Sequence, residues 1–234
     1  MIYFKVIISV TGAIEMKNIK IDAMLKEKIP TYSLAALSFE MEVMETGDEL
    51  RRAMQELATV VMESLTLETL LKEPRIVAAR NGYKALGKDP SRYRLATESL
   101  LRRLIKGNGL YEVNNAVDIG NVLSIHTQRS VAVLDEAQIH GDVKIRVGRD
   151  EPFEGIGRGS INVSNIPIYC DELGPFGSST SDTLRTSIQL STRQILLFII
   201  SFNGADDLVQ DVELAKKLFK KYGGVTDFLV KIIE

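Results

Sequence analysis

The sequence predicts an α+β fold in a single domain over residues 1–234, with helices followed by a β-rich half. Apolar residues recur at helical spacing over 48–125, and short β-branched runs separated by glycines follow Ser130. Neither an internal repeat nor a low-complexity linker divides the chain. A chain of this length buries about 70% of the surface that its unfolded form exposes, so its core needs neither a disulfide nor a structural metal.

The first half begins with a strand, because apolar residues alternate over 33–43. A helix is expected to open at 46–48, and its apolar face runs from Leu50 to Val61. The next helix should start at Pro74, since proline suits a first helical turn, and should stop at Gly87.

Two more helices are expected after a turn at 88–91, where a proline restricts the backbone. Thr97 is predicted to cap the first of them, which ends at Gly107. Asn114 or Asn115 caps the second.

The second half is read as strands at 131–134, 143–147, 166–169 and 195–202, separated by glycine-rich turns. Apolar residues from Leu208 to Phe219 then predict an amphipathic helix, closed by Gly223 and Gly224. The last segment, 226–233, suits either a strand or a helix.

Composition excludes several kinds of site. Cys170 is the one cysteine, and His126 and His140 stand apart, so no zinc-type metal centre and no cofactor are expected. No apolar run is long enough for a membrane span, and no basic region precedes the short apolar start, so a cytoplasmic protein is expected. Residues 1–15 are a possible N-terminal extension, with Met1 or Met16 as the start.

Charge is unevenly distributed. The net charge is −2, but residues 74–106 contain nine basic and two acidic residues, so this stretch carries +7 and the rest −9. A local basic patch on an acidic chain is typical of one anionic partner, and also of a solvated helix face. Neither a Gly-x-x-x-x-Gly-Lys-Ser/Thr loop nor a Gly-x-Ser-x-Gly elbow is present.

Two segments combine residue types that bind ligands. In 80–94, arginines and lysines that can grip phosphate alternate with tyrosines that can stack on a base or an amino-acid ring. In 114–121, four amide or carboxylate side chains stand in an apolar context, which indicates either helix capping with a buried polar network or a ligand site. Glu98 and Arg102, four residues apart, can pair on their helix.

The order of three motifs resembles the editing domain of the phenylalanyl-tRNA synthetase beta subunit, and more closely the free-standing relatives of that domain. The motifs are Tyr-Lys-x-Leu-Gly-x-Asp-Pro-x-x-Tyr from Tyr83, Glu-x-Leu-x-Arg-Arg from Glu98, and Asn-x-x-Val-Asp-x-x-Asn from Asn114. The similar region covers about 75–202. The resemblance implies a mixed sheet or barrel-like core with flanking helices. It also implies hydrolysis of tyrosine wrongly attached to the phenylalanine tRNA, here in trans.

Carried over position by position, the resemblance matches Asn121 and Asp135. Gly120 stands where the family has threonine, and Ala132 where bacterial synthetases have a histidine implicated in editing. These two replacements favour the alternative of a non-catalytic module that binds tRNA, a free amino acid or an amino-acid derivative. A structural protein with a relic pocket is a third interpretation.

The free-standing relatives suggest a back wall at 170–186, where Asp182 can bind an ammonium group and Arg185 a carboxylate or phosphate. Buried together, Asp182 and Arg185 are also expected to pair with each other. Arg146 either lines the pocket or faces solvent, and Glu151 and Glu154 are expected on a surface loop.

The expected roles are then as follows, with tRNA or aminoacyl-tRNA as the partner, no membrane, and the oligomeric state open. Catalytic residues are Asn115, Asp118, Asn121 and Asp182; substrate-binding residues are Tyr83, Tyr93, Arg146, Ser181 and Arg185; phosphate-binding residues are Arg80, Lys84, Arg92, Arg94 and Arg103.

Overall fold

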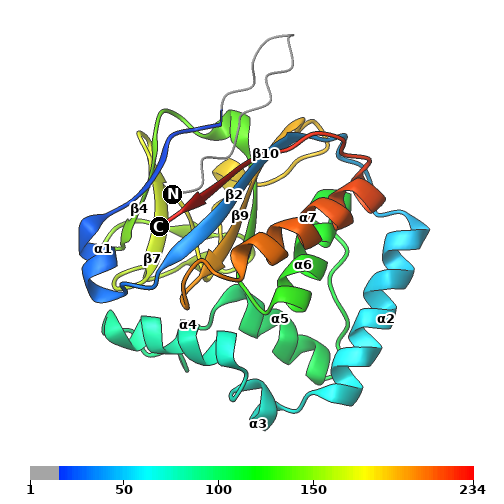
Figure 1. The fold of residues 1–234 in the computed structure, drawn as a ribbon, viewed down its shortest axis with the longest axis horizontal. Coiled ribbons are helices and arrows are strands. Elements are labelled where there is room, and N and C mark those ends of the chain that lie inside the picture. Colours follow the sequence, from blue (N-terminus) through cyan, green and yellow to red (C-terminus); the bar gives the residue numbers. More distant parts are fainter. Residues whose placement is uncertain (1–15) are drawn as a thin grey trace.

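The computed structural model describes residues 16–234. It stacks two four-stranded sheets face to face and packs a layer of helices against the free side of one of them (Figure 1). The α+β class is therefore confirmed, with a mixed sheet and flanking helices. The expectations for residues 1–15 and for the start of the chain lie outside the described residues.

The central sheet, sheet B, has the strand order β10-β2-β9-β3 and is antiparallel throughout. Its strands are β2 (Ser33–Glu40), β3 (Val131–Asp135), β9 (Gln194–Ser201) and β10 (Leu229–Ile233). β2 and β9 are apolar and buried on both faces because structure covers both sides of the sheet. The open choice at 226–233 is thereby resolved as a strand.

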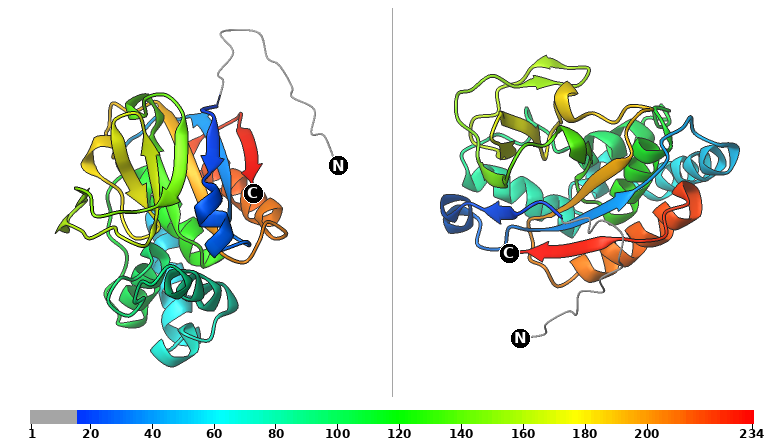
Figure 2. Two further views of the ribbon diagram at one scale, coloured as in Figure 1. Left: turned by 90° about the vertical axis from the view of Figure 1, so that its left-hand side faces the viewer. Right: turned by 90° about the horizontal axis from the view of Figure 1, so that it is seen from above.

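The outer sheet, sheet A, has the order β1-β4-β7-β8 and is mixed, since β1 runs parallel to β4. Its strands are β1 (Ile19–Ile21), β4 (Val143–Val147), β7 (Pro167–Asp171) and β8 (Gly174–Ser178). A small hairpin of β5 (Glu154–Gly155) and β6 (Gly159–Ser160) projects beside this sheet (Figure 2). The short helix α1 (Ala23–Lys28) follows β1.

Six further helices complete the described chain. They are α2 (Asp48–Ser64), α3 (Leu67–Leu70), α4 (Pro74–Ala85), α5 (Ala96–Ile105), α6 (Asn115–Thr127) and α7 (Leu208–Gly223), and two 3-10 turns lie at η1 (Glu136–Gln138) and η2 (Leu184–Thr186). One apolar core fills the space between the two sheets, and a second joins sheet B to α2, α6 and α7. A third core holds α2 to α6 together.

Most helix ends agree with the sequence, and one differs. Asn114 caps α6, and Gly224 ends α7 in the left-handed conformation. Thr97 was expected to cap α5, but Leu95 holds that position. The Thr97 hydroxyl instead donates to the carbonyl of Ser124, which ties α5 to α6.

Candidate functional site

The polar residues at the start of α6 support the local backbone. The Asn115 side chain accepts a hydrogen bond from Met44 N and donates to the carbonyl of Glu42. The Asp118 carboxylate accepts from the Thr46 hydroxyl and from the backbone N–H of Val113. Asn115 and Asp118, which were expected to act in catalysis, therefore both use their side chains in hydrogen bonds within the protein.

The environment of Asp118 fits this supporting role. Burial raises the pKa of its carboxyl, while the hydrogen bonds from Thr46 and Val113 act in the opposite direction. Asn121 lies further along α6, is half-buried, and makes no side-chain hydrogen bond to any residue in 16–234.

The two replaced family positions are packing positions in this fold. A Cβ atom on Gly120 would lie 2.3 Å from Cγ2 of Val133, so α6 can approach β3 only with glycine there. Ala132 is buried in the core between the sheets, directly opposite Phe198 on β9. Asp135 is bound by the Thr192 hydroxyl at 2.7 Å and caps η1.

The cations of 80–103 divide into two groups. Arg80 binds the fully buried Glu98 at 2.9 Å, and Arg103 binds the carbonyls of Asn108 and Gly109. Arg102 also binds Glu98, at 2.8 Å, so the expected pair is confirmed. Arg80 and Arg103 were expected to bind phosphate, but both guanidinium groups are held by the protein.

Three cations of this segment are exposed: Lys84 at the end of α4, and Arg92 and Arg94 in the turn that follows. No hydrogen bond or ion pair joins their side chains to another described residue. Between them, Lys88 turns inward to the carbonyls of Asn162 and Ser164 and lies 3.7 Å from the ring centroid of the half-buried Tyr93. The turn therefore presents three positive groups on a backbone that Lys88 fixes.

The loop after β8 is anchored to this basic turn. The Tyr83 hydroxyl lies 2.8 Å from the Thr180 hydroxyl, and the backbone N–H of Ala96 donates to the carbonyl of Ser179. Within the loop, the Ser178 hydroxyl accepts from the backbone N–H groups of Thr180 and Ser181. Tyr83, which was expected to be open for stacking, is fully buried and serves this anchor.

Between the two sheets this loop meets a cluster of buried polar groups, which we call the tyrosine cluster: Tyr32, Tyr83, Tyr169, Ser179 and Asp182. The three tyrosines and Ser179 are completely buried. Ser179 lies near all three tyrosines, and burial raises the pKa of each tyrosine.

Hydrogen-bond partners are missing in the tyrosine cluster. The hydroxyls of Tyr32, Tyr169 and Ser179 and the Oδ1 atom of Asp182 are all buried without a partner among the described residues. Such atoms are rare in folded proteins, because each costs about 1–3 kcal/mol when left unpaired. Burial also raises the pKa of Asp182 to about 7, partly opposed by the backbone N–H of Ser178.

Asp182 does not pair with Arg185. Arg185 makes a bidentate ion pair with Asp171, with both N–O distances at 2.8 Å, and also binds the carbonyl of Gln138. Arg185 therefore fastens η2 to the end of β7. Ser181 is half-buried in the loop, and its hydroxyl is directed to the carbonyl of Asp182 at 3.4 Å.

Arg146 lines a surface hollow of about 350 Å³ at the edge of sheet A, together with Lys144 and Arg149. It is already paired with Glu151 at 2.7 Å, and this contact raises the pKa of Arg146 and lowers that of Glu151. Asp22 holds Lys144 in the same hollow. Glu154 is exposed, as expected, whereas Glu151 is half-buried by its arginine.

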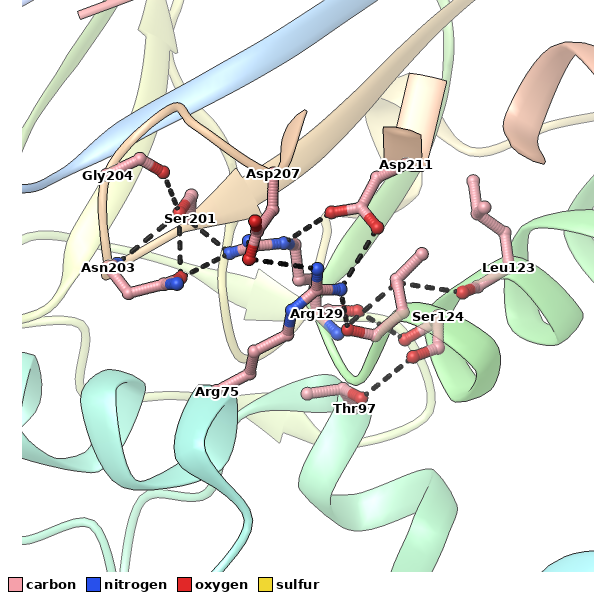
Figure 3. Close-up of polar contacts among 11 residues, drawn as sticks. Arg75, Thr97, Leu123, Ser124, Arg129, Ser201, Asn203, Gly204, Asp207 and Asp211 are labelled. Carbon is pink, nitrogen blue, oxygen red and sulfur yellow. Dashed lines mark hydrogen bonds and ion pairs between the residues drawn. The ribbon is translucent and has the colours of Figure 1, made fainter. Parts of the chain in front are cut away.

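A second buried network lies on the side of α4 and α7 and ties helices to sheet B (Figure 3). Arg129 donates to Asp211 on α7 and to Ser201 on β9, each at 2.7 Å. Arg75 on α4 reaches the same Asp211 at 3.0 Å. Since two arginines share their charge with Asp211 and Asp207, this network connects elements and leaves little net charge for a ligand.

Sequence reasoning found Asp182 and Tyr83 but missed Tyr32, Tyr169 and Ser179. Tyr32 and Tyr169 stand in apolar strand contexts that are typical of ordinary core aromatics, so the sequence gives no signal for them. Within 16–234, no group of three or more His, Cys, Asp or Glu side chains is arranged to hold a metal ion. No helix of the described chain is long and apolar enough to cross a membrane.

Two stacked sheets, a helical layer and a polar loop beside a basic turn thus define an α+β domain with an interior polar cluster. Residues 78–213 match the model of the B3/4 domain, which occurs in the phenylalanyl-tRNA synthetase beta subunit. The match covers more than half of the chain, and the chain belongs to the B3/4 domain family. The resemblance stated from the sequence motifs is thereby confirmed.

A solved N-terminal fragment of the phenylalanyl-tRNA synthetase beta subunit from Pyrococcus horikoshii is similar at 10% sequence identity, with a TM-score of 0.44. The alignment covers 92% of this chain and 50% of that one, so the chain spans half the length of the solved fragment. No curated protein matches the sequence.

Proposed function

We propose that this domain hydrolyses mischarged aminoacyl-tRNA in trans, in the cytoplasm, with the aminoacyl end at the tyrosine cluster and the tRNA backbone on the basic turn. The observation that carries the proposal is the direct connection between these two parts. Tyr83 and Ala96, which flank the turn, bind Thr180 and Ser179 of the loop that leads to Asp182.

The basic turn suits phosphate. Lys84, Arg92 and Arg94 are exposed, and Arg80, which was also expected to bind phosphate, is held in place by Glu98. Three free cations allow about three phosphate contacts, which makes binding to RNA dependent on salt. This number fits one end of a tRNA and is too small for general nucleic-acid binding, in agreement with the net charge of −2.

The cluster suits the aminoacyl end. Water attacks the ester carbonyl, the bond to the ribose oxygen breaks, and the products are a free amino acid and a tRNA with its terminal hydroxyl restored. Because the ester is already activated, orienting the ester and a water molecule supplies much of the rate increase. Asp182 and the neighbouring hydroxyls are the groups of the site that remain available for this task.

A deacylation assay tests the proposal. The purified chain is incubated with tRNAs that carry mismatched amino acids, and release of amino acid is followed beside a no-protein blank. We expect release with at least one mismatched pair and a loss of about tenfold or more in the Asp182→Asn variant. A triple Lys84→Gln, Arg92→Gln, Arg94→Gln variant should lower the rate mainly at low tRNA concentration. A matched triple at Lys217, Lys220 and Lys231 should leave it unchanged.

A second function, a non-catalytic binding module, is favoured by one specific observation. Asp118 and Asp135, two polar positions of the family pattern, and the neighbouring Asn115 are all engaged in supporting this chain's own backbone or side chains. Salt-sensitive tRNA binding by well-folded protein, with no amino acid released from any tRNA in the panel, would establish this function and refute the hydrolase.

A further inference from the structure

We infer that the tyrosine cluster is a binding site for a primary ammonium group, so that the domain selects aminoacyl ligands with a free α-amino group over N-acylated ones. The inference rests on the proposed function in taking the ligand to be an aminoacyl group. It goes further in naming the chemical group that is recognised.

The tyrosine cluster contains acceptor atoms that no described residue uses. Asp182 Oδ1 and the hydroxyl oxygens of Tyr32, Tyr169 and Ser179 are buried and have no hydrogen-bond partner in 16–234. An ammonium group has three donors and no acceptor, so it requires several oxygen atoms around one point. A carboxylate with hydroxyl oxygens on neighbouring side chains supplies them.

The fold places the carboxylate against the aromatic part of the cluster. A Cβ atom on Gly177 would lie 2.6 Å from Asp182 Oδ1 and 2.7 Å from the ring of Tyr169. Both groups therefore pack over the bare Cα of Gly177. The backbone of Gly177 also pairs with that of Asp182 in an isolated antiparallel bridge. Any larger residue would push the carboxylate away from Tyr169.

The Asp182 carboxylate lacks the cation that the sequence led us to expect beside it. The cation expected for Asp182 was Arg185, which is fully engaged by Asp171 and Gln138. No ion pair among the described residues includes Asp182. A carboxylate that is buried without a cation is costly, and a ligand ammonium removes that cost by forming a charge-assisted hydrogen bond. Tyrosine rings beside the site add cation–π attraction.

The β5–β6 hairpin lies beside the tyrosine cluster, where a ligand would approach Asp182. The β5–β6 hairpin contacts the segment that carries Asp182 through the hydrogen bond from Ile156 N to the Asp182 carbonyl, at 3.0 Å, and through a bridge from Gly155 to Thr183. Gly157 and Gly159 have positive φ angles of 66° and 68°, so the tip of the hairpin follows a path that favours glycine. For a ligand to reach Asp182 from this side, this hairpin has to move.

The experiment uses small probes and no tRNA. Isothermal titration of the full chain is carried out with the amides of phenylalanine, tyrosine, leucine and alanine, and with the N-acetyl form of each. We expect at least one amide to bind, and we expect its N-acetyl form to bind more weakly by a factor of about ten or greater. Hydrogen bonds to a charged group contribute at least that factor. Binding of neither form, or equal binding of both, overturns the inference.

Variants locate the binding. Asp182→Asn should weaken amide binding about tenfold or more, Tyr169→Phe should weaken it measurably, and the exposed Asp206→Asn should not change it. If Asp182→Asn does not fold, Tyr169→Phe and Ser179→Ala decide, and normal binding in both refutes the site. Amide binding without deacylation would retain the ammonium site and refute the hydrolase. Equal deacylation of N-acetylated and free aminoacyl-tRNA would retain the hydrolase and refute the ammonium site.

Discussion

Replacing Asp182 by asparagine should change the stability of the protein in a way that depends on pH. Burial raises the pKa of Asp182 from its ordinary value of 3.8 to about 7 in the folded chain. Between these values the folded state holds a proton that the unfolded state has released. The free energy of unfolding of the wild type therefore falls as pH rises from about 4 to about 7. Asparagine carries no charge and removes this loss.

The magnitude follows from the pKa shift. Each pKa unit corresponds to about 1.4 kcal/mol, so the shift corresponds to about 4 kcal/mol at most. The residue keeps some contact with solvent, which reduces the penalty to about 2–4 kcal/mol. For a chain of this size, that is a rise of about 4–16 °C in Tm at pH 8 for the Asp182→Asn variant, and almost none at pH 4.

Urea unfolding and thermal melts at pH 4, 6 and 8 measure this difference, with Asp206→Asn as the control, since Asp206 is exposed in the loop before α7. The main titratable neighbour of Asp182 is Tyr169, whose pKa is raised far above its usual value, so it stays neutral over this range. A variant that is less stable than the wild type at pH 8, or that differs from it equally at all three pH values, would refute the reasoning. An amine that binds the cluster should stabilise the wild type most at pH 8.

Two further predictions concern the frame of the site. Glu98→Ala should lower the free energy of unfolding by about 3–5 kcal/mol, because two arginines lose a fully buried partner, whereas Glu68→Ala breaks an exposed pair and should cost less than about 1 kcal/mol. Equal costs in urea unfolding would refute this assignment. Gly120→Thr, which restores the family residue, should cost about 1–3 kcal/mol by clashing with Val133, and Val133→Ala in the same chain should recover part of it. A Gly120→Thr protein with unchanged stability would show that the Val133 side chain moves aside without cost, and would refute this prediction.

The elements that the sequence predicts well are those decided by neighbouring residues. α4 starts at Pro74 and α7 ends just before Gly224, because proline and glycine act on the local backbone. β9 was expected from its continuous apolar run, which also fits its central place in sheet B. The cap of α5 was wrong because Thr97 found a partner on α6, and no local rule includes that contact.

The candidate site was less predictable because it is assembled from distant segments. Tyr32 precedes β2, Tyr83 lies on α4, Tyr169 on β7, and Asp182 in the loop after β8. Asp182 was considered because it lies in the back wall that the free-standing relatives suggest, yet its expected partner Arg185 pairs with Asp171. Which carboxylate an arginine reaches depends on the tertiary packing of η2 against β7, which spacing along the chain does not encode.

Two sets of polar side chains in this domain differ in whether their hydrogen-bonding groups are used by the protein itself. On α6, Asp118 matches the family motif and Asn115 lies within it, but their oxygens accept hydrogen bonds from Met44, Thr46 and Val113. Between the sheets, the hydroxyls of Tyr32, Tyr169 and Ser179 and the Oδ1 atom of Asp182 are buried without a partner among the described residues. A fold keeps unpaired buried acceptors at a cost in stability, so they are expected where a ligand supplies the missing donors. We therefore expect the motif on α6 to shape the backbone around the proposed site, and we expect Asp182 and its neighbouring tyrosines to determine the chemical selectivity of the domain.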